Sequence, residues 1–162
     1  PIVREDRLLT GVDAWANTND IPLKARTWDA EAIDNWAALS LSELQQAMNV
    51  QAQEDAKHLR LQCEQGITKR TKNVYLLTHV PPLHAVQSDK AKPLQNDRSV
   101  FYSCALADIL TDLQKDHPTI AFHIYSGHVH KTFQYQISEN MYGHVMDAYR
   151  PEKNQPLTWI TI

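Results

Sequence analysis

The chain has 162 residues, of which 43% are hydrophobic and 22% charged, and its formal net charge is −3. A chain of this length and balance can bury one sizeable core, which argues against global disorder, and the negative charge gives no specific nucleic-acid signal. No apolar run reaches the roughly 18 residues of a membrane span, and no signal segment opens the sequence. Cys63 and Cys104 are too few for a disulfide framework, so we expect buried free thiols and a cytoplasmic location.

The first part of the chain predicts a strand, a loop and a short helix. The sequence opens on Pro1 rather than methionine, and we expect a segment upstream of it. Arg7–Trp15 has the short apolar character of a strand that leads into a glycine-containing turn. Residues 16–30 are rich in turn formers and predict a loop, and a short helix is expected over 29–38 with Asp29 as its N-cap.

The clearest helix is predicted over residues 40–65. Ser40 and Glu43 have the spacing of a capping box, in which each side chain pairs with a free backbone amide at the helix start. Apolar residues then recur every three or four positions and form one stripe, which is typical of core packing: Leu41, Leu44, Met48, Ala52, Ala56, Leu59 and Cys63.

A strand, a helix and a second strand follow in that order. Residues 73–78, NVYLLT, predict a strand that is covered on both faces, and Pro81 and Pro82 prevent it from continuing. A helix is predicted over 99–116 and a second strand over 119–125. This order predicts a right-handed crossover between two adjacent parallel strands, and sheets of this kind bind ligands at the carboxyl ends of their strands.

Three histidines follow the carboxyl ends of these two strands. His79 comes directly after the first strand, and the second runs into Gly127, His128 and His130 in the sequence SGHVH. Gly127 allows a sharp turn there and is a candidate for the shell around a site. Because parallel neighbours lie about 4.8 Å apart, His79 and His128 could share one metal ion while His130 points to a second. We therefore take these three histidines as candidate metal ligands.

The remaining histidines are assigned to other roles. His58 and His117 are expected at the surface, and His123 is expected to pack within its strand. His84 follows the two prolines and His144 opens a later strand, so both are candidates for the shell that orients the metal ligands.

The rest of the chain alternates in the manner of three antiparallel strands, FQYQISEN at 133–140, YGHVMDAYR at 142–150 and PLTWITI at 156–162. Turns are expected at Asn140–Gly143 and Pro151–Pro156. Together with the crossover unit, this pattern predicts a mixed α/β or α+β layered sandwich.

Two of these motifs resemble a known family. LLTHVPP and YSGHVH look like the last two signature blocks of the calcineurin-like metallophosphoesterases, whose pattern runs DxH, GDxxD, GNHD or GNHE, a lone His and GHxH. The resemblance covers residues 73–162 well and 7–15 weakly, and leaves 16–70 as a variable loop and helical insertion. It implies that residues 1–162 are a single partial domain, the C-terminal portion of a four-layer α-β-β-α sandwich that ends in an antiparallel meander.

The resemblance also implies a chemistry. It makes His79 and His128 ligands of one divalent ion and His130 a ligand of another, with Mn, Fe, Zn or Ni as the two metals. Such a pair activates a hydroxide that hydrolyses a phosphate mono- or diester, here of unknown class. The DxH, GDxxD and GNHD or GNHE blocks are absent, so a missing N-terminal half is expected as partner. We therefore assign no catalytic residue to this chain, and expect it to be inactive alone and to self-associate.

Two alternatives remain open at the sequence level. The chain could be a non-catalytic interaction module with the same fold, or a different HxH metallohydrolase of the metallo-β-lactamase type. The latter enzymes usually follow HxH with aspartate, whereas Lys131 follows here. Trp15, Trp28 and Trp36 could anchor a small lid or form a stacking surface for a base or sugar.

Overall fold

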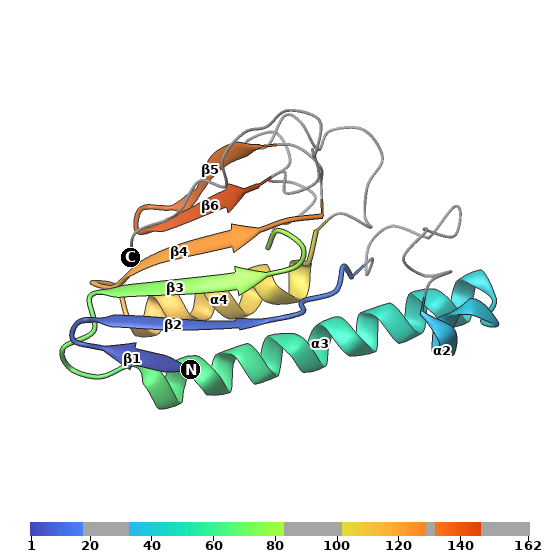
Figure 1. Ribbon diagram of the computed structural model, residues 1–162, viewed down its shortest axis with the longest axis horizontal. Coiled ribbons are helices and arrows are strands. Elements are labelled where there is room, and N and C mark those ends of the chain that lie inside the picture. The colour runs from blue at the N-terminus through green and yellow to red at the C-terminus, as the bar shows by residue number, and fades with distance from the viewer. Residues whose placement is uncertain (18–32, 83–101, 129–131, 147–162) are drawn as a thin grey trace, which may run out of the picture.

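The computed structural model describes residues 1–17, 33–82, 102–128 and 132–146. These residues form a mixed α/β fold with one six-stranded mixed sheet and three helices (Figure 1). In chain order the elements are β1 (Ile2–Arg4), β2 (Arg7–Val12), α2 (Asp34–Ala37), α3 (Leu41–Gly66), β3 (Asn73–Thr78), α4 (Cys104–Asp116), β4 (Ala121–Ser126), β5 (Phe133–Ser138) and β6 (Met141–Val145).

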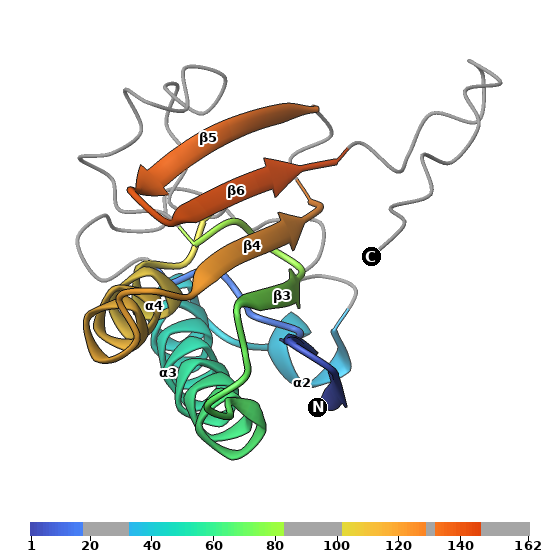
Figure 2. The same ribbon diagram turned by 90° about the vertical axis from the view of Figure 1, so that its left-hand side faces the viewer.

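The strands lie side by side in the order β1-β2-β3-β4-β6-β5. The four inner strands β2, β3, β4 and β6 are mutually parallel, and β1 and β5 are antiparallel at the two edges. The connections from β2 to β3 and from β3 to β4 each contain a helix, and both step the same way across the sheet. Right-handed crossovers that step the same way place their helices on the same face, as α3 and α4 are here (Figure 2).

The predicted long helix is confirmed as α3. Ser40 and Glu43 form the expected capping box: the Glu43 amide donates to Ser40 Oγ at 3.4 Å, and the Ser40 amide donates to Glu43 Oε2 at 2.8 Å. The predicted stripe is buried from Leu44 onward, whereas Leu41 lies in the first turn and is 38% exposed. From Ala52 to Cys63 the stripe packs with the inner face of the sheet, including Leu8 and Val74, in the main core, whereas Leu44 and Met48 belong to a second, smaller cluster.

The second crossover helix begins later than predicted. Residues 99–101 lie outside the described residues, and Ser103 has extended backbone angles, so α4 begins at Cys104. Ser103 Oγ accepts a hydrogen bond from the Leu106 amide at 3.3 Å and so caps the helix. The helix buries Leu106, Leu110 and Leu113 completely against the sheet. As expected, Cys63 and Cys104 are both buried and are not joined in a disulfide.

The amino-terminal elements differ from the prediction at their ends. The strand expected over Arg7–Trp15 ends at Val12, and β1, which was not predicted, pairs with it as an antiparallel edge. The short helix spans only Asp34–Ala37, with Ile33 as an N-cap that makes no side-chain hydrogen bond. Asp29, the expected cap, and most of the predicted loop lie outside the described residues.

The carboxyl-terminal strands are partly as predicted. β3 has the predicted bounds, β4 runs from Ala121 to Ser126 rather than over 119–125, and β5 and β6 form the expected antiparallel pair. The turn lies at 139–140, so Gly143 is inside β6 and not in a turn. The reason is packing: the ring of Tyr135 on β5 occupies the space that a side chain at position 143 would need. The third expected strand and the turn before it lie outside the described residues.

Candidate functional site

Backbone hydrogen bonds bring three strand ends together. The His79 amide donates to the carbonyl of Asp13 at 2.9 Å, and the Gly127 amide donates to the carbonyl of His79 at 3.0 Å. The parallel pairing of β2, β3 and β4 therefore continues beyond the last residue of each strand. This continuation holds Asp13, His79 and Gly127 side by side at the carboxyl ends of the three strands, which we call the carboxyl edge of the sheet.

The two described candidate ligands lie next to each other at this edge. The imidazole rings of His79 and His128 have centroids 4.6 Å apart and planes 59° apart. The predicted adjacency of the two strands and the convergence of these histidines are confirmed. His79 Nε2 is buried and has no hydrogen-bond partner among the described residues. A buried ring nitrogen that makes no hydrogen bond lowers the stability of the fold, unless a ligand such as a metal ion binds it.

The backbone turns at His128 and not at the preceding glycine. His128 has φ 63°, in the left-handed region, whereas Gly127 has no positive φ. The expectation that Gly127 makes the sharp turn is therefore wrong. Histidine is one of the residues that adopt this region more often than most, and side chains held in it gather at functional sites. His128 has this conformation where its ring lies beside that of His79.

Trp15 packs on His79, and Trp36 packs on Trp15. The ring of Trp15 lies 5.3 Å from that of His79 and 5.2 Å from that of Trp36, centroid to centroid. Trp36 packs on a second small core that contains Leu44, Met48 and Val80. These contacts favour the lid interpretation of Trp15 and Trp36; Trp28 lies outside the described residues.

Asn17, which the sequence analysis missed, ties this edge to α4. Its Oδ1 accepts hydrogen bonds from Ser103 Oγ at 3.3 Å and from the Ala105 amide at 3.1 Å. The Ser103 amide in turn donates to the carbonyl of Pro81 at 2.9 Å. The loop that follows His79 is thus fastened at the helix start. The only signal in the sequence is an asparagine among other turn formers, which cannot be told from a solvated loop residue.

The donor set of the described residues is incomplete. Within residues 1–17, 33–82, 102–128 and 132–146, no group of three His, Cys, Asp or Glu side chains gathers as a metal site would require. His130 and His84 lie outside these ranges. His79 and His128 alone fit part of a site for a metal that prefers nitrogen ligands, such as Zn or Ni.

His144 lies one row back from this edge. It sits within β6, and its ring stacks on that of Tyr125 at 4.7 Å and lies 6.1 Å from that of His123. His123 also stacks between Tyr75 and Tyr142, as expected for a packing role. The structure therefore places His144 in a row of the sheet beside Tyr125, next to the row that holds His123.

His123 and His144 are expected to make the free energy of unfolding depend on pH. Burial lowers the pKa of His123, and burial together with the charge of His123 lowers the pKa of His144, both from 6.5. Below about pH 6.5 the unfolded chain therefore binds more protons than the folded chain, and the free energy of unfolding falls as the pH falls. Urea unfolding at about pH 7.5 and about pH 5.5 will measure this loss. A His123→Phe/His144→Phe variant should lose less stability on acidification; an equal loss would contradict this origin.

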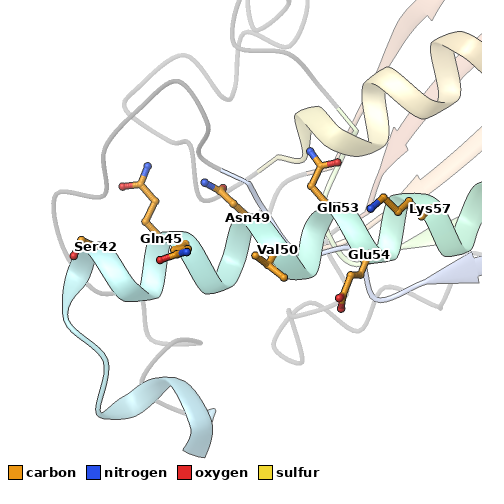
Figure 3. A pocket seen from close by; sticks show the side chains of 8 residues that line it. Ser42, Gln45, Asn49, Val50, Gln53, Glu54 and Lys57 are labelled. Atoms are coloured by element: carbon orange, nitrogen blue, oxygen red, sulfur yellow. The ribbon is translucent and has the colours of Figure 1, made fainter.

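One hollow of the described surface lies away from these residues. It has a volume of about 520 Å³ and follows the solvent side of α3, where Gln45, Asn49 and Gln53 line it (Figure 3). All of its lining residues come from one helix, so no groups converge on it from different elements. It is not a candidate site by the usual criteria for ligand pockets.

None of the described helices combines the length and the apolar character needed to span a membrane. No family model, no curated protein and no solved structure matches the chain at a significant level.

Proposed function

We propose that the chain provides the histidine ligands of a dinuclear metal centre in a metallophosphoesterase that hydrolyses phosphate mono- or diesters. One observation carries the proposal: His79 and His128, from the ends of adjacent parallel strands, meet with ring centroids 4.6 Å apart, and His79 Nε2 is buried without a partner. The motifs THVPP and GHVH around these residues agree with it.

The residues of the candidate site have different roles in this proposal. Neutral imidazoles of His79 and His128 would donate their lone pairs to one ion, and His130 would serve the second. The ions, when bound, supply a hydroxide nucleophile and neutralise charge on the phosphoryl group. Trp15 keeps water from one side of His79, and the backbone bonds from Asp13 to Gly127 hold the ring pair in register. Preorganisation of this kind is what an open metal site needs.

The proposal includes the finer architecture. The described sheet, with α3 and α4 on one face, would be half of a four-layer sandwich. Its second half would supply the carboxylates that bridge the two ions and complete their coordination. The phosphorylated substrate is then bound between the halves, at the edge where His79 and His128 lie.

Metal titration tests the proposal. Zn²⁺ and Mn²⁺ would be titrated calorimetrically into the chain and into His79→Ala, His128→Ala and His58→Ala variants. His58 is an exposed histidine of α3 and is the matched control. We expect His79→Ala and His128→Ala to weaken Zn²⁺ binding by at least about 10-fold, the lower limit for residues that merely orient a ligand, and His58→Ala to leave it unchanged.

The contrary result is equally clear. Equal Zn²⁺ affinity in the His79→Ala variant, with an unchanged circular dichroism spectrum, would contradict the metal centre and favour the interaction module. The same samples can be assayed on a chromogenic phosphodiester. We expect turnover near background, because no carboxylate joins the two imidazoles in the part of the chain that is described. Turnover of about 1 per second that His128→Ala abolishes would show that the chain completes its own centre.

A further inference from the structure

The face of the sheet opposite α3 and α4 carries two uncharged rows, next to a row at its amino end that contains Arg4 and Arg7. In the register of the sheet, residues that pair across neighbouring strands lie on the same face. The first row reads Ile2, Leu9, Tyr75, His123, Tyr142 and Gln136, and the second reads Gly11, Leu77, Tyr125, His144 and Gln134. We call these two rows the open face. Ile2 is 57% exposed and Leu77 is 53% exposed, whereas Leu76 and Phe122 on the helix-covered face are fully buried.

The composition of the open face is that of an interface. The strands β3, β4, β5 and β6 contain no Lys, Arg, Asp or Glu on either side. Strands without charge on either side are typical of sheets that are covered on both faces. Tyrosine enrichment and the absence of charge are also typical of the cores of protein interfaces. The open face is therefore built to be covered.

The aromatic rings determine what can cover it. Tyr75, His123 and Tyr142 stack at 5.1 and 5.6 Å with planes within 20° of parallel, and Tyr125 stacks on His144 at 4.7 Å and 13°. These separations are close to the distance between strands, so the rings project from the sheet and each stacks on the ring of the neighbouring strand. They present their edges outward. A base or a sugar stacks on ring faces, and nucleic acid also needs cations, so a protein surface is the better occupant.

We infer that, when the second half proposed above is not bound on this same face, a second copy of this chain covers the open face, in a two-fold dimer whose sheets pack face to face. The area suits such a dimer: five strands about 20 Å long and the shorter β1, each about 4.8 Å from the next, give about 500 Å² per copy. That area is near the lower limit for specific interfaces, which fits a reversible dimer. An uncharged surface can meet its own copy without repulsion.

The charges at the two ends of the rows set the orientation. Arg4 and Arg7 lie at the amino end of the open face, and Asp13 follows at the carboxyl end of β2. A two-fold axis across the strands makes each strand cross its own counterpart in the opposite direction. The Arg7 end of β2 then meets the partner's Asp13 end. A two-fold axis along the strands would instead set β2 against the partner's β6, which carries no charge to pair with Arg7 or Asp13.

Two matched leucines test the dimer. Leu77→Lys places a charge in the open face, and Leu61→Lys makes the same change on α3, where the leucine is 50% exposed. Sedimentation velocity over a concentration series measures the dissociation constant. We expect Leu77→Lys to weaken the dimer by at least about 100-fold, because symmetry introduces the charge twice, and Leu61→Lys to leave it unchanged. A strictly monomeric wild-type chain, or a dimer that only Leu61→Lys disrupts, would overturn the inference.

A charge exchange tests the orientation. Arg7→Asp and Asp13→Arg should each weaken the dimer, and the double variant should regain most of the loss, because the two positions would again carry opposite charges. Failure of the double variant to recover would overturn the antiparallel arrangement. Zn²⁺ titration of Leu77→Lys, which changes none of the candidate ligands, distinguishes this outcome from failure of the proposed metal centre.

Discussion

Gly11→Ala is expected to lower the free energy of unfolding by about 3 kcal/mol, at the upper end of the cost of overpacking. A Cβ atom at Gly11 would overlap the carbonyl oxygen of Leu77 and would lie only 3.0 Å from its Cβ atom. Because a backbone atom is in the way, no side chain can rotate to make room. β2 and β3 must separate, which also strains the hydrogen bond from His79 to Asp13.

Gly127→Ala is the matched control for this substitution. Its added Cβ would meet only the carbonyl of His79, at the ordinary contact distance of 3.8 Å. Equilibrium unfolding in urea compares the two variants with the parent chain. A loss of less than about 1 kcal/mol in Gly11→Ala would mean that the two strands yield more readily than a paired sheet should.

Phe122→Ala is expected to lower the free energy of unfolding by about 4 kcal/mol, the typical cost of deleting a fully buried phenylalanine. Phe122 lies on β4 near the middle of the sheet, is 0% exposed and is the largest fully buried side chain among the described residues. Its loss leaves a cavity beneath α4, and the neighbouring strands hold that cavity open. The amide hydrogens of the inner strands should also exchange with solvent faster in this variant than in the parent chain.

Phe133→Ala provides the comparison for Phe122→Ala. Phe133 lies on the edge strand β5 and is only partly buried against the same core. Its removal lets solvent enter in place of a cavity, so a loss of about half that of Phe122→Ala is expected. Equal losses in the two variants would contradict the assignment of β4 to the middle of the sheet.

The parts of the fold that the sequence predicted well depend on local chemistry. The capping box of Ser40 and Glu43 involves neighbouring residues only, and α3 begins where it indicates. Pro81 and Pro82 cannot pair in a sheet, and β3 ends before them as expected. The parallel pairing of β3 with β4 follows from the strand, helix, strand order, because a helical crossover is the usual connection between parallel neighbours.

The parts that it missed depend on tertiary contacts. The alternating pattern of β5 and β6 is the same for either strand order, so it could not show that β6 inserts beside β4. Gly143 resembled a turn residue because its sequence neighbours do not reveal the ring of Tyr135 above it. β1 has only three residues and no pattern of its own.

The candidate site divides in the same way. His79 and His128 could be identified because each directly follows a predicted strand, and the topology rule then brings them together. The left-handed conformation of His128 could not be predicted, because the neighbouring glycine is the residue that normally adopts it. Trp15 and Asn17 reach the site from a loop whose path depends on packing against α3 and α4.

The non-local pairing of the sheet has a consequence for the order of folding. β2 joins β3 from Arg7 to Asn73, and β3 joins β4 from Asn73 to Ala121, so long stretches of chain must close before either pairing forms. Closures of this kind are slow, whereas helices such as α3 form early. The imidazole pair therefore arises only when the β3 and β4 ladder has closed to its last residues. An ion that binds both imidazoles would therefore stabilise the completed sheet relative to every partly folded form, and it could bind only in the last step of folding.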